Sequence, residues 1–230
     1  MWVQRYKKKC RVAYFNSRNI AKTTYFDNYY EFKHAYYGLF RTFARKSSIL
    51  LVRVMIHILD KDFEISITKE TIQERVKALA DRLNKDYEGK SPVMVCILNG
   101  AFVFASDLVR CLMFQPDIQF AKYSSYDGMD TTGKVNEILA ATTDLKGRDV
   151  IIVEDIVDTG ITMKHVVARF KEQGAASVKI ACMLQKPEKL QVELDVDYCA
   201  MQIPNAFIVG YGLDYDGYGR NYPDIYSVVD

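Results

Sequence analysis

The chain has 230 residues, and its 31 Lys and Arg against 29 Asp and Glu give a formal net charge of +2. The longest wholly apolar runs are far shorter than the roughly 20 residues that cross a bilayer, so a transmembrane helix is excluded. With 49% hydrophobic residues and only 5 Pro, the chain is neither disordered overall nor collagen-like.

The small net charge is the sum of two parts of the chain that differ in composition and carry opposite charges. Residues 1–54 carry 12 Lys and Arg against 2 Asp and Glu, a charge of +10, and hold 13 of the 29 aromatic side chains. Residues 55–230 carry 19 basic and 27 acidic side chains, a charge of −8, with the aliphatic-rich composition of one globular domain. Composition therefore divides the chain into a basic, aromatic-rich leader, residues 1–54, and a domain, residues 55–230.

The leader shows no sustained hydrophobic period, and three interpretations of it stay open. As a nucleic-acid arm, Lys7 and Arg11 would neutralise phosphates while Tyr6 and Tyr14 stack on bases. As an organelle targeting segment it is suitably poor in acids, but its three Ser and many Tyr fit badly. In the third interpretation translation starts at Met55, and the leader is a non-native extension.

The domain begins with an amphipathic helix predicted over residues 68–86, with Thr68 as its N-cap. Residues 93–98 then predict a buried strand, and residues 100–113 a second helix, which together open a βαβ unit. The first helix has the apolar stripe Ile72, Val76, Leu79, Ala80 and Leu83. The second is expected to bury Val103, Leu108 and Leu112.

Strands and helices alternate through the rest of the domain. A polar stretch, residues 124–133, interrupts two of the strands and is expected to be a mobile lid. One further helix is predicted over residues 160–173, with Gly174 as its C-cap. The remaining strands are predicted at 117–123, 134–139, 149–153, 177–184, 197–203, 207–209 and 225–229, the last three finishing the sheet. This order predicts an α/β domain whose largely parallel sheet has helices on both faces and binds ligands at the carboxyl ends of its strands.

The five cysteines show no Cys-x-x-Cys spacing. Cys96 and Cys182 lie inside apolar, strand-like runs, which favours buried reduced thiols over disulfides or a zinc site. A cytoplasmic location is expected on this basis.

Between residues 149 and 162 an apolar strand runs into three carboxylates and then into a Thr-Gly-x-Thr turn that opens a helix. The helix N–H groups, the hydroxyls of Thr159 and Thr162, and the close approach that Gly160 allows make an anion site suited to a monoester phosphate. Glu154 and Asp155 are hard oxygen ligands suited to ribose hydroxyls or to Mg²⁺. A merely structural acidic turn is disfavoured, because the clustered acids would repel one another. The segment therefore predicts a site for a phosphorylated sugar.

This segment resembles the phosphoribosyl-diphosphate signature of the type I phosphoribosyltransferases, and specifically of the hypoxanthine-guanine phosphoribosyltransferases, over residues 153–160. Three further segments match that subfamily in order. Residues 98–100 resemble its diphosphate loop, residues 124–126, followed by 132–133, its flexible catalytic loop, and residues 207–215 with Arg220 its base-binding hood. The resemblance implies the type I phosphoribosyltransferase fold, a central mostly parallel sheet flanked by helices with a small hood for the purine.

The resemblance also assigns the ligands of the sugar. Thr159, Gly160 and Thr162 are implied to hold the 5′-phosphate, and Glu154 and Asp155 the ribose hydroxyls, directly or through Mg²⁺.

The diphosphate is assigned to Leu98, Asn99, Gly100 and Arg220. Asn99 departs from the family, because many members carry Lys there. The departure is tolerable if the loop binds the diphosphate through its backbone amides. Relatives present those amides by means of a non-proline cis peptide bond. If the Lys ammonium helps to hold the diphosphate, affinity for the sugar donor is expected to be lower.

Three residues are implied to be catalytic. Asp158 resembles the general base that accepts the imidazole proton of the purine. Ser125 and Tyr126 belong to the lid, which excludes water while the purine attacks the sugar.

The purine is assigned to Lys186, Phe207, Ile208 and Asp214. Lys186 is implied to donate to the 6-oxo group, which favours oxopurines over adenine. Phe207 stacks on the ring, Ile208 contributes main-chain groups, and Asp214 ligates a second Mg²⁺ on the diphosphate.

The implied function is purine salvage, with transfer of the phosphoribosyl group from 5-phosphoribosyl 1-diphosphate to hypoxanthine or guanine. Mg²⁺ is the expected cofactor and a homodimer or homotetramer the expected assembly, without membrane or nucleic acid as partner. The alternative is a regulator that senses the same sugar diphosphate and binds nucleic acid through the leader. A base, a lid and a purine clamp favour the enzyme, because a sensor needs none of them. The ranking of hypoxanthine, guanine and xanthine stays open.

Overall fold

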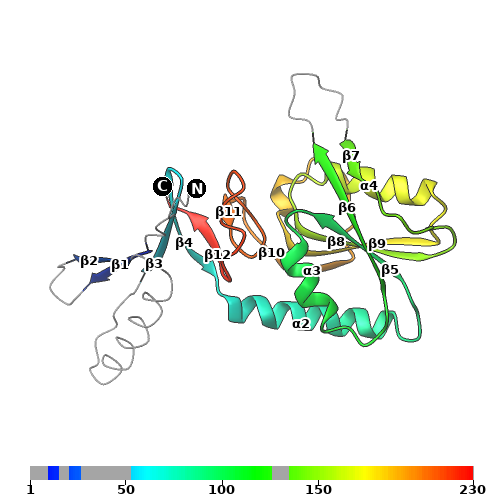
Figure 1. The fold of residues 1–230 in the computed structure, drawn as a ribbon, viewed down its shortest axis with the longest axis horizontal. Helices are drawn as coiled ribbons and strands as arrows, with labels where there is room; N and C mark the ends of the chain where they lie inside the picture. Colours follow the sequence, from blue (N-terminus) through cyan, green and yellow to red (C-terminus); the bar gives the residue numbers. More distant parts are fainter. Residues whose placement is uncertain (1–9, 16–20, 27–52, 126–134, 230) are drawn as a thin grey trace, which may run out of the picture. The chain divides into compact units, whose positions relative to one another are not determined.

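The structure is a computed structural model that describes residues 10–15, 21–26, 53–125 and 135–229 (Figure 1). These residues divide into two compact units. The first takes the described residues up to Ile67 and from Ile225 onward, and the second runs from Thr68 to Asp224.

The first unit holds an antiparallel sheet. From β2 (Ala21–Phe26) its order continues through β1 (Cys10–Phe15), β3 (Arg53–Ile58), β4 (Lys61–Ile67) and β12 (Ile225–Val228). Parts of the leader thus form strands although the sequence shows no period there, and the compositional boundary at residues 54 and 55 lies inside β3.

The expectation that residues 225–229 finish the main sheet is wrong. β12 returns to β4 instead, where Tyr226 pairs with Ile65 and Val228 with Phe63. The pairing is consistent with burial, since Ile225, Tyr226 and Phe63 are almost completely removed from solvent.

The second unit is built on the parallel sheet that the sequence predicts. Its strand order is β10-β9-β8-β5-β6-β7, and every neighbouring pair is parallel except β6 with β7. Cys96 and Cys182 are buried free thiols within it, as expected. The strands are β5 (Val93–Leu98), β6 (Asp117–Ser125), β7 (Val135–Leu139), β8 (Asp149–Val157), β9 (Ser177–Gln185) and β10 (Tyr198–Gln202). The short β11 (Ile208–Val209) lies outside this sheet, which corrects the expectation for residues 207–209.

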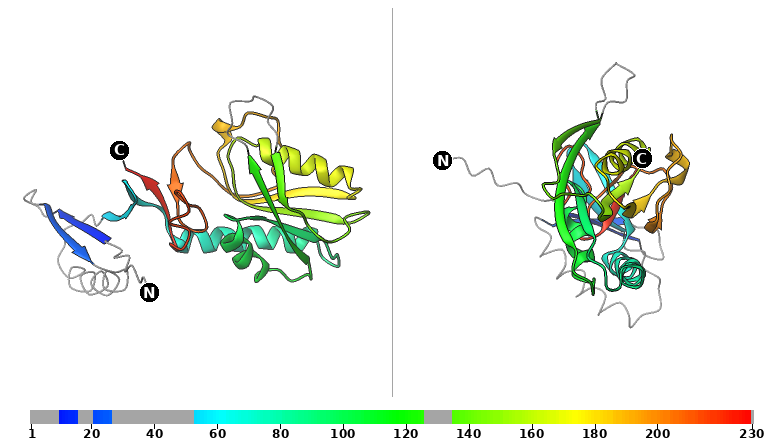
Figure 2. Two further views of the ribbon diagram at one scale, coloured as in Figure 1. Left: turned by 45° about the horizontal axis from the view of Figure 1, so that its top comes forward. Right: turned by 90° about the vertical axis from the view of Figure 1, so that its right-hand side faces the viewer.

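Helices cover both faces of this sheet (Figures 1 and 2). α4 (Ile161–Glu172) buries Met163, Val166 and Phe170 in a core shared with β5, β8 and β9. α2 (Lys69–Asp86) and α3 (Phe102–Val109) lie on the other face. In the part of the chain that the structure describes, no helix is long and apolar enough to cross a membrane.

α2 follows the sequence pattern closely. The Thr68 hydroxyl caps it by accepting from the N–H of Thr71, and its buried residues are the five of the predicted stripe. α4 ends one residue earlier than expected, with Gln173 as its cap, and Gly174 follows with φ 85°.

α3 is shorter than predicted. It ends at Val109, and the next N–H groups bond three residues back, Cys111 to Leu108 and Leu112 to Val109, which tightens the chain into a turn toward β6. Leu108 is buried as expected, whereas Leu112 lies outside the helix and is only half-buried.

β8 is longer than predicted. The expected strand ends at Val153, but parallel pairing with β9 continues to Val157, opposite Gln185. Glu154 and Asp155 are therefore part of the strand and not of the turn that follows it.

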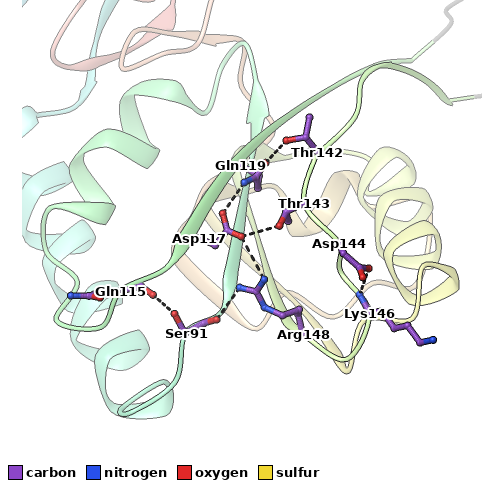
Figure 3. Close-up of polar contacts among 9 residues, drawn as sticks. All are labelled: Ser91, Gln115, Asp117, Gln119, Thr142, Thr143, Asp144, Lys146 and Arg148. Atoms are coloured by element: carbon purple, nitrogen blue, oxygen red, sulfur yellow. Dashed lines mark hydrogen bonds and ion pairs between the residues drawn. The ribbon is translucent and has the colours of Figure 1, made fainter.

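Polar contacts tie together the amino ends of the strands, at the edge opposite the site described below (Figure 3). The Asp117 carboxylate accepts hydrogen bonds from Gln119 Nε2 at 2.7 Å and Thr143 Oγ1 at 3.0 Å. It also lies 3.5 Å from Arg148 Nη1. The pKa of Asp117 lies below its usual range, chiefly because Gln119 donates a hydrogen bond to its carboxylate. The hydrogen bond from Thr143 and the positive charge of Arg148 lower this pKa further. This cluster fixes the connection into β8.

Replacing Asp117 by Ala is expected to destabilise the chain at neutral pH by about 1 kcal/mol, a loss typical of a hydrogen-bonded carboxylate, which lowers the thermal midpoint by about 2–4 °C. Because the folded pKa is depressed, the stabilisation is present above the unfolded pKa of about 3.9 and is lost as pH falls through the folded value. Thermal melts between pH 7 and pH 3 measure this. Asp144→Ala, which removes one contact in an exposed turn, is the control, and a gap from wild type that stays constant with pH would contradict the assignment.

Candidate active site

A cavity of about 450 Å³ lies at the carboxyl ends of β5 and β8 and the start of α4. It brings together residues that are far apart in the sequence, from the strand-to-helix segment, the loop after β5 and the hood. The sequence-predicted residues that line it are Leu98, Gly100, Glu154, Asp155, Asp158, Thr159, Gly160, Thr162, Asp214 and Arg220.

The start of α4 forms one wall as an open anion site. Gly160 is the N-cap with φ 80°, a left-handed conformation that favours glycine. A Cβ there would also lie 3.0 Å from Leu190 Cδ2 and 3.1 Å from Val192 Cγ2. Gly160 has no side chain that could cap the helix, and Ile161 N–H donates to the Thr159 hydroxyl at 3.5 Å. Thr159 and Thr162 line the cavity beside the other N–H groups of the first turn, which a helix start leaves without intrahelical partners.

Two adjacent carboxylates line the cavity, that of Glu154 buried and that of Asp155 partly exposed. Burial, followed by the charge of Asp155, raises the pKa of Glu154 well above its usual range. Burial likewise raises the pKa of Asp155, although Arg220 opposes the shift. Asp155 N–H donates to Glu154 Oε1 at 3.1 Å, and Ile156 N–H donates to Asp155 Oδ1 at 2.8 Å. Because burial and mutual repulsion disfavour ionisation of both carboxyls, a cation or hydroxyl donors would stabilise their charged forms here.

The backbone of the loop after β5 lies against the Asp155 carboxylate, with no room for a side chain at Gly100. The peptide bond between Leu98 and Asn99 is cis, and Leu98 and Gly100 line the cavity whereas Asn99 is not among the lining residues. A Cβ on Gly100 would lie 1.5 Å from Asp155 Oδ2, and one on Gly212 would lie 2.2 Å from the Gly100 carbonyl oxygen. Only glycine therefore allows the loop, the end of β8 and the hood to meet.

The hood delivers a guanidinium and a carboxylate to the same cavity. Arg220 Nη1 donates to the Gly212 carbonyl at 2.7 Å, and Arg220 Nη2 lies 2.7 Å from Asp214 Oδ1. The other oxygen of Asp214 accepts from Gly217 N–H at 2.7 Å. Both side chains of the pair are thus held in place before any ligand arrives.

Asp158 has two oxygens in different environments. Its Oδ2 accepts a hydrogen bond from Lys189 Nζ at 2.7 Å and lies 3.8 Å from Lys186 Nζ. Its Oδ1 is buried and has no hydrogen-bond partner among the described residues. A buried acceptor without a partner is rare in folded proteins and marks a place where a proton donor on a ligand fits.

The residues assigned to the purine lie near Asp158 or in the hood. The Lys186 ammonium is almost fully buried, and burial lowers its pKa. Phe207 is half-exposed, with its ring 5.3 Å from that of Tyr215 in an edge-to-face arrangement. Ile208 begins β11 and is buried.

The predicted lid lies mostly outside the described residues. Ser125 is the last residue of β6, where it pairs with Val135 of β7. Tyr126, and the rest of the stretch to residue 134, lie outside what the structure describes.

Comparison with known proteins decides the family. The model of the phosphoribosyl transferase domain matches residues 66–216. The chain belongs to the phosphoribosyltransferase family. A hypoxanthine-guanine phosphoribosyltransferase of Streptococcus pneumoniae is 44% identical over 170 residues, 73% of this chain and 94% of the relative.

Solved structures agree with this family. A hypoxanthine phosphoribosyltransferase from Staphylococcus aureus aligns with a TM-score of 0.70 at 37% identity, covering 72% of this chain and 91% of the other. A hypoxanthine-guanine phosphoribosyltransferase from Bacillus anthracis, with a HEPES molecule in its active site, aligns with a TM-score of 0.68 at 39% identity, covering 72% and 96%. These alignments bear out the type I phosphoribosyltransferase fold expected from the sequence.

Two residues at the site carry no prediction from the sequence. Lys189 binds Asp158 from a short 3₁₀ helix, η1 (Pro187–Lys189), and its only sequence signal is its spacing of three from Lys186. Tyr123 lines the cavity with its hydroxyl donating to Glu137 at 3.1 Å, and burial raises its pKa. The sequence gives no signal for Tyr123, because a Tyr at this place, two residues before Ser125, looks like any apolar residue of a strand.

Replacing Glu154 by Gln is expected to stabilise the ligand-free chain at pH 8, raising its thermal midpoint by several degrees. The folded pKa is raised, so ionisation above that pKa destabilises the fold, and stability is regained as pH falls toward the unfolded value of about 4.3. Melts at pH 8, 6 and 4 should show the gain shrinking toward zero, with the exposed Glu172→Gln as the control. A variant less stable than wild type at pH 8 would refute this account of the buried pair.

Proposed function

We propose that this chain transfers the phosphoribosyl group from 5-phosphoribosyl 1-diphosphate to hypoxanthine or guanine, forming IMP or GMP and diphosphate. The family, and relatives named for this activity, support the reaction class. The observation that carries the proposal is the arrangement of one cavity. The start of α4, the adjacent carboxyls of Glu154 and Asp155, and Asp158, whose buried Oδ1 has no hydrogen-bond partner among the described residues, lie together there.

The sugar donor is bound by groups matched to its parts. The start of α4, with Thr159 and Thr162, binds the 5′-phosphate through N–H and hydroxyl donors. Glu154 and Asp155 accept from the ribose hydroxyls. Gly100, through backbone, and Arg220, through a charge-assisted hydrogen bond, hold the diphosphate.

The purine is bound on the side of Asp158. Lys186 donates to the 6-oxo oxygen, Phe207 stacks on the ring and Ile208 offers main-chain groups to its edge. Recognition of an oxygen by a buried ammonium selects against adenine, whose amino group would face another donor.

Bond exchange occurs at the anomeric carbon. An imidazole nitrogen of the purine forms a bond to that carbon as the carbon–oxygen bond to diphosphate breaks and its electron pair leaves with the diphosphate. Asp158 Oδ1 accepts the proton of the imidazole N–H. Ser125 and Tyr126 belong to the segment that we expect to exclude water during this step.

Mg²⁺ is the cofactor that the donor set fits. Mg²⁺ sites use one or two carboxylates and complete their shell with substrate oxygens and water, and the adjacent Glu154 and Asp155 match that requirement. Asp214 is the proposed ligand for a second ion, on the diphosphate side. When bound, the metal would neutralise the leaving diphosphate.

The setting of the enzyme follows from the same reasoning. We infer that residues 55–230 form the catalytic domain and that it acts as a homodimer or homotetramer. We also infer that it acts in the cytoplasm, which its free thiols support. The alternative, a regulator that binds nucleic acid, receives no support from the relatives, which are named as enzymes.

Purified full-length protein with Mg²⁺ and 5-phosphoribosyl 1-diphosphate is expected to consume hypoxanthine or guanine and to release diphosphate. Adenine should be a poor substrate. Product formation followed by chromatography measures this, and a chain that starts at Met55 should be active if residues 55–230 suffice. Inactivity toward every oxopurine, together with salt-sensitive nucleic-acid binding, would favour the regulator.

Asp158→Asn is expected to lower kcat by about 10²-fold or more, the usual contribution of a positioned base. Asparagine keeps the size of the side chain but is a far weaker proton acceptor, so affinity for 5-phosphoribosyl 1-diphosphate should change little. Steady-state kinetics and isothermal titration measure the two quantities. Wild-type turnover in this variant would exclude Asp158 as the base.

A further inference from the structure

Lys186 and Lys189 reach the same carboxylate because of the turn that joins them. Pro187 opens η1, and Lys189 N–H bonds to the Lys186 carbonyl at 3.1 Å. Residues three apart in a 3₁₀ helix lie on the same side. The turn is anchored at the site, since Lys186 N–H donates to the Val157 carbonyl at 3.0 Å and Gln191 N–H to the Thr159 carbonyl at 2.9 Å.

The two ammonium groups are not equivalent. Lys189 makes a direct hydrogen bond of 2.7 Å to Asp158 Oδ2 while its side chain stays 38% exposed. Lys186 Nζ lies 3.8 Å from the same oxygen, beyond hydrogen-bond distance, and the Lys186 side chain is only 8% exposed. The partly exposed lysine therefore occupies the oxygen, and the buried one remains available.

From these contacts we propose that Lys189 is a positioning residue for the reaction, which locks Asp158 Oδ2 and so presents Oδ1 to the purine N–H. The inference rests on the proposed transferase activity and extends it to a residue that touches no reacting atom.

The same contact frees Lys186 for the purine. A carboxylate oxygen that has lost Lys189 would attract the remaining ammonium, which is already within 3.8 Å. Closure of that gap would rotate the Asp158 carboxylate away from its working orientation and withdraw Lys186 from the 6-oxo group. Lys189 therefore supports both proton acceptance and oxopurine recognition.

The test compares Lys189→Met, Lys189→Gln and Lys189→Arg in the full chain, with Lys171→Met as a matched control from the exposed last turn of α4. Neutral replacement is expected to lower kcat about tenfold and to raise KM for hypoxanthine, since small displacements of a catalytic group are costly. KM for 5-phosphoribosyl 1-diphosphate and the thermal midpoint should change little. Arginine, which keeps the charge and can donate to Oδ2, should restore most of kcat.

The outcomes separate this inference from the function on which it rests. An inactive wild-type chain contradicts the proposed transferase. An active wild type with unchanged kcat in both neutral variants overturns the role of Lys189. So does a loss of the same size in all three Lys189 variants, because the charged contact would then not be the cause. Two neutral variants keep the test valid should one of them fold poorly.

Discussion

β8 is hydrogen-bonded to parallel neighbours on both sides, β5 and β9, and helices cover both faces of the sheet. Val150 to Val153 are fully buried as a result. The same strand continues into Glu154, which is buried, and Asp155, which is partly exposed, and burial is the largest cause of the raised pKa of both carboxyls. The apolar strand thus places two carboxyls where their ionisation is disfavoured. The charge of Arg220 is one of the contributions that oppose the shift of Asp155.

Three segments that line the cavity are packed so closely that moving one would require the others to move. Gly100 lies against Asp155, and Gly212 lies against Gly100, so the loop after β5, the end of β8 and the hood set one another's positions. The hood is fixed further by Asp107 of α3, whose Oδ2 accepts from Tyr211 at 2.8 Å and from Gln73 of α2 at 2.7 Å. Helices on one face of the sheet therefore support a ligand clamp at its carboxyl edge. This explains how a surface segment made of turns can hold Arg220 in a defined place.

Local patterns predicted the elements whose stability is local. α2 has a strong cap and a regular apolar stripe, and its buried residues are those that the period indicates. Among the predictions that failed are three for which tertiary contacts override the local pattern. α3 ends early because the chain must turn toward β6, β8 runs past Val153 because β9 continues to pair with it, and β12 leaves the main sheet to pair with β4. The hydrophobic period of a single segment contains no information about any of these three features.

The sequence by itself determined the class of fold, the family and the chemical groups at the site, because each motif is a short run whose residue types suit one ligand. A turn that opens a helix, hard carboxylates and a lone Asp can be recognised without coordinates when they follow a buried strand. Only the tertiary structure decided how those groups are paired. Lys189 and Asp158 are 31 residues apart, and their contact depends on the register of β8 with β9 and on the short helix that follows. Strand register is a cooperative property of the whole sheet, and for that reason the choice between Lys186 and Lys189 as the partner of Asp158 could not be made from the sequence.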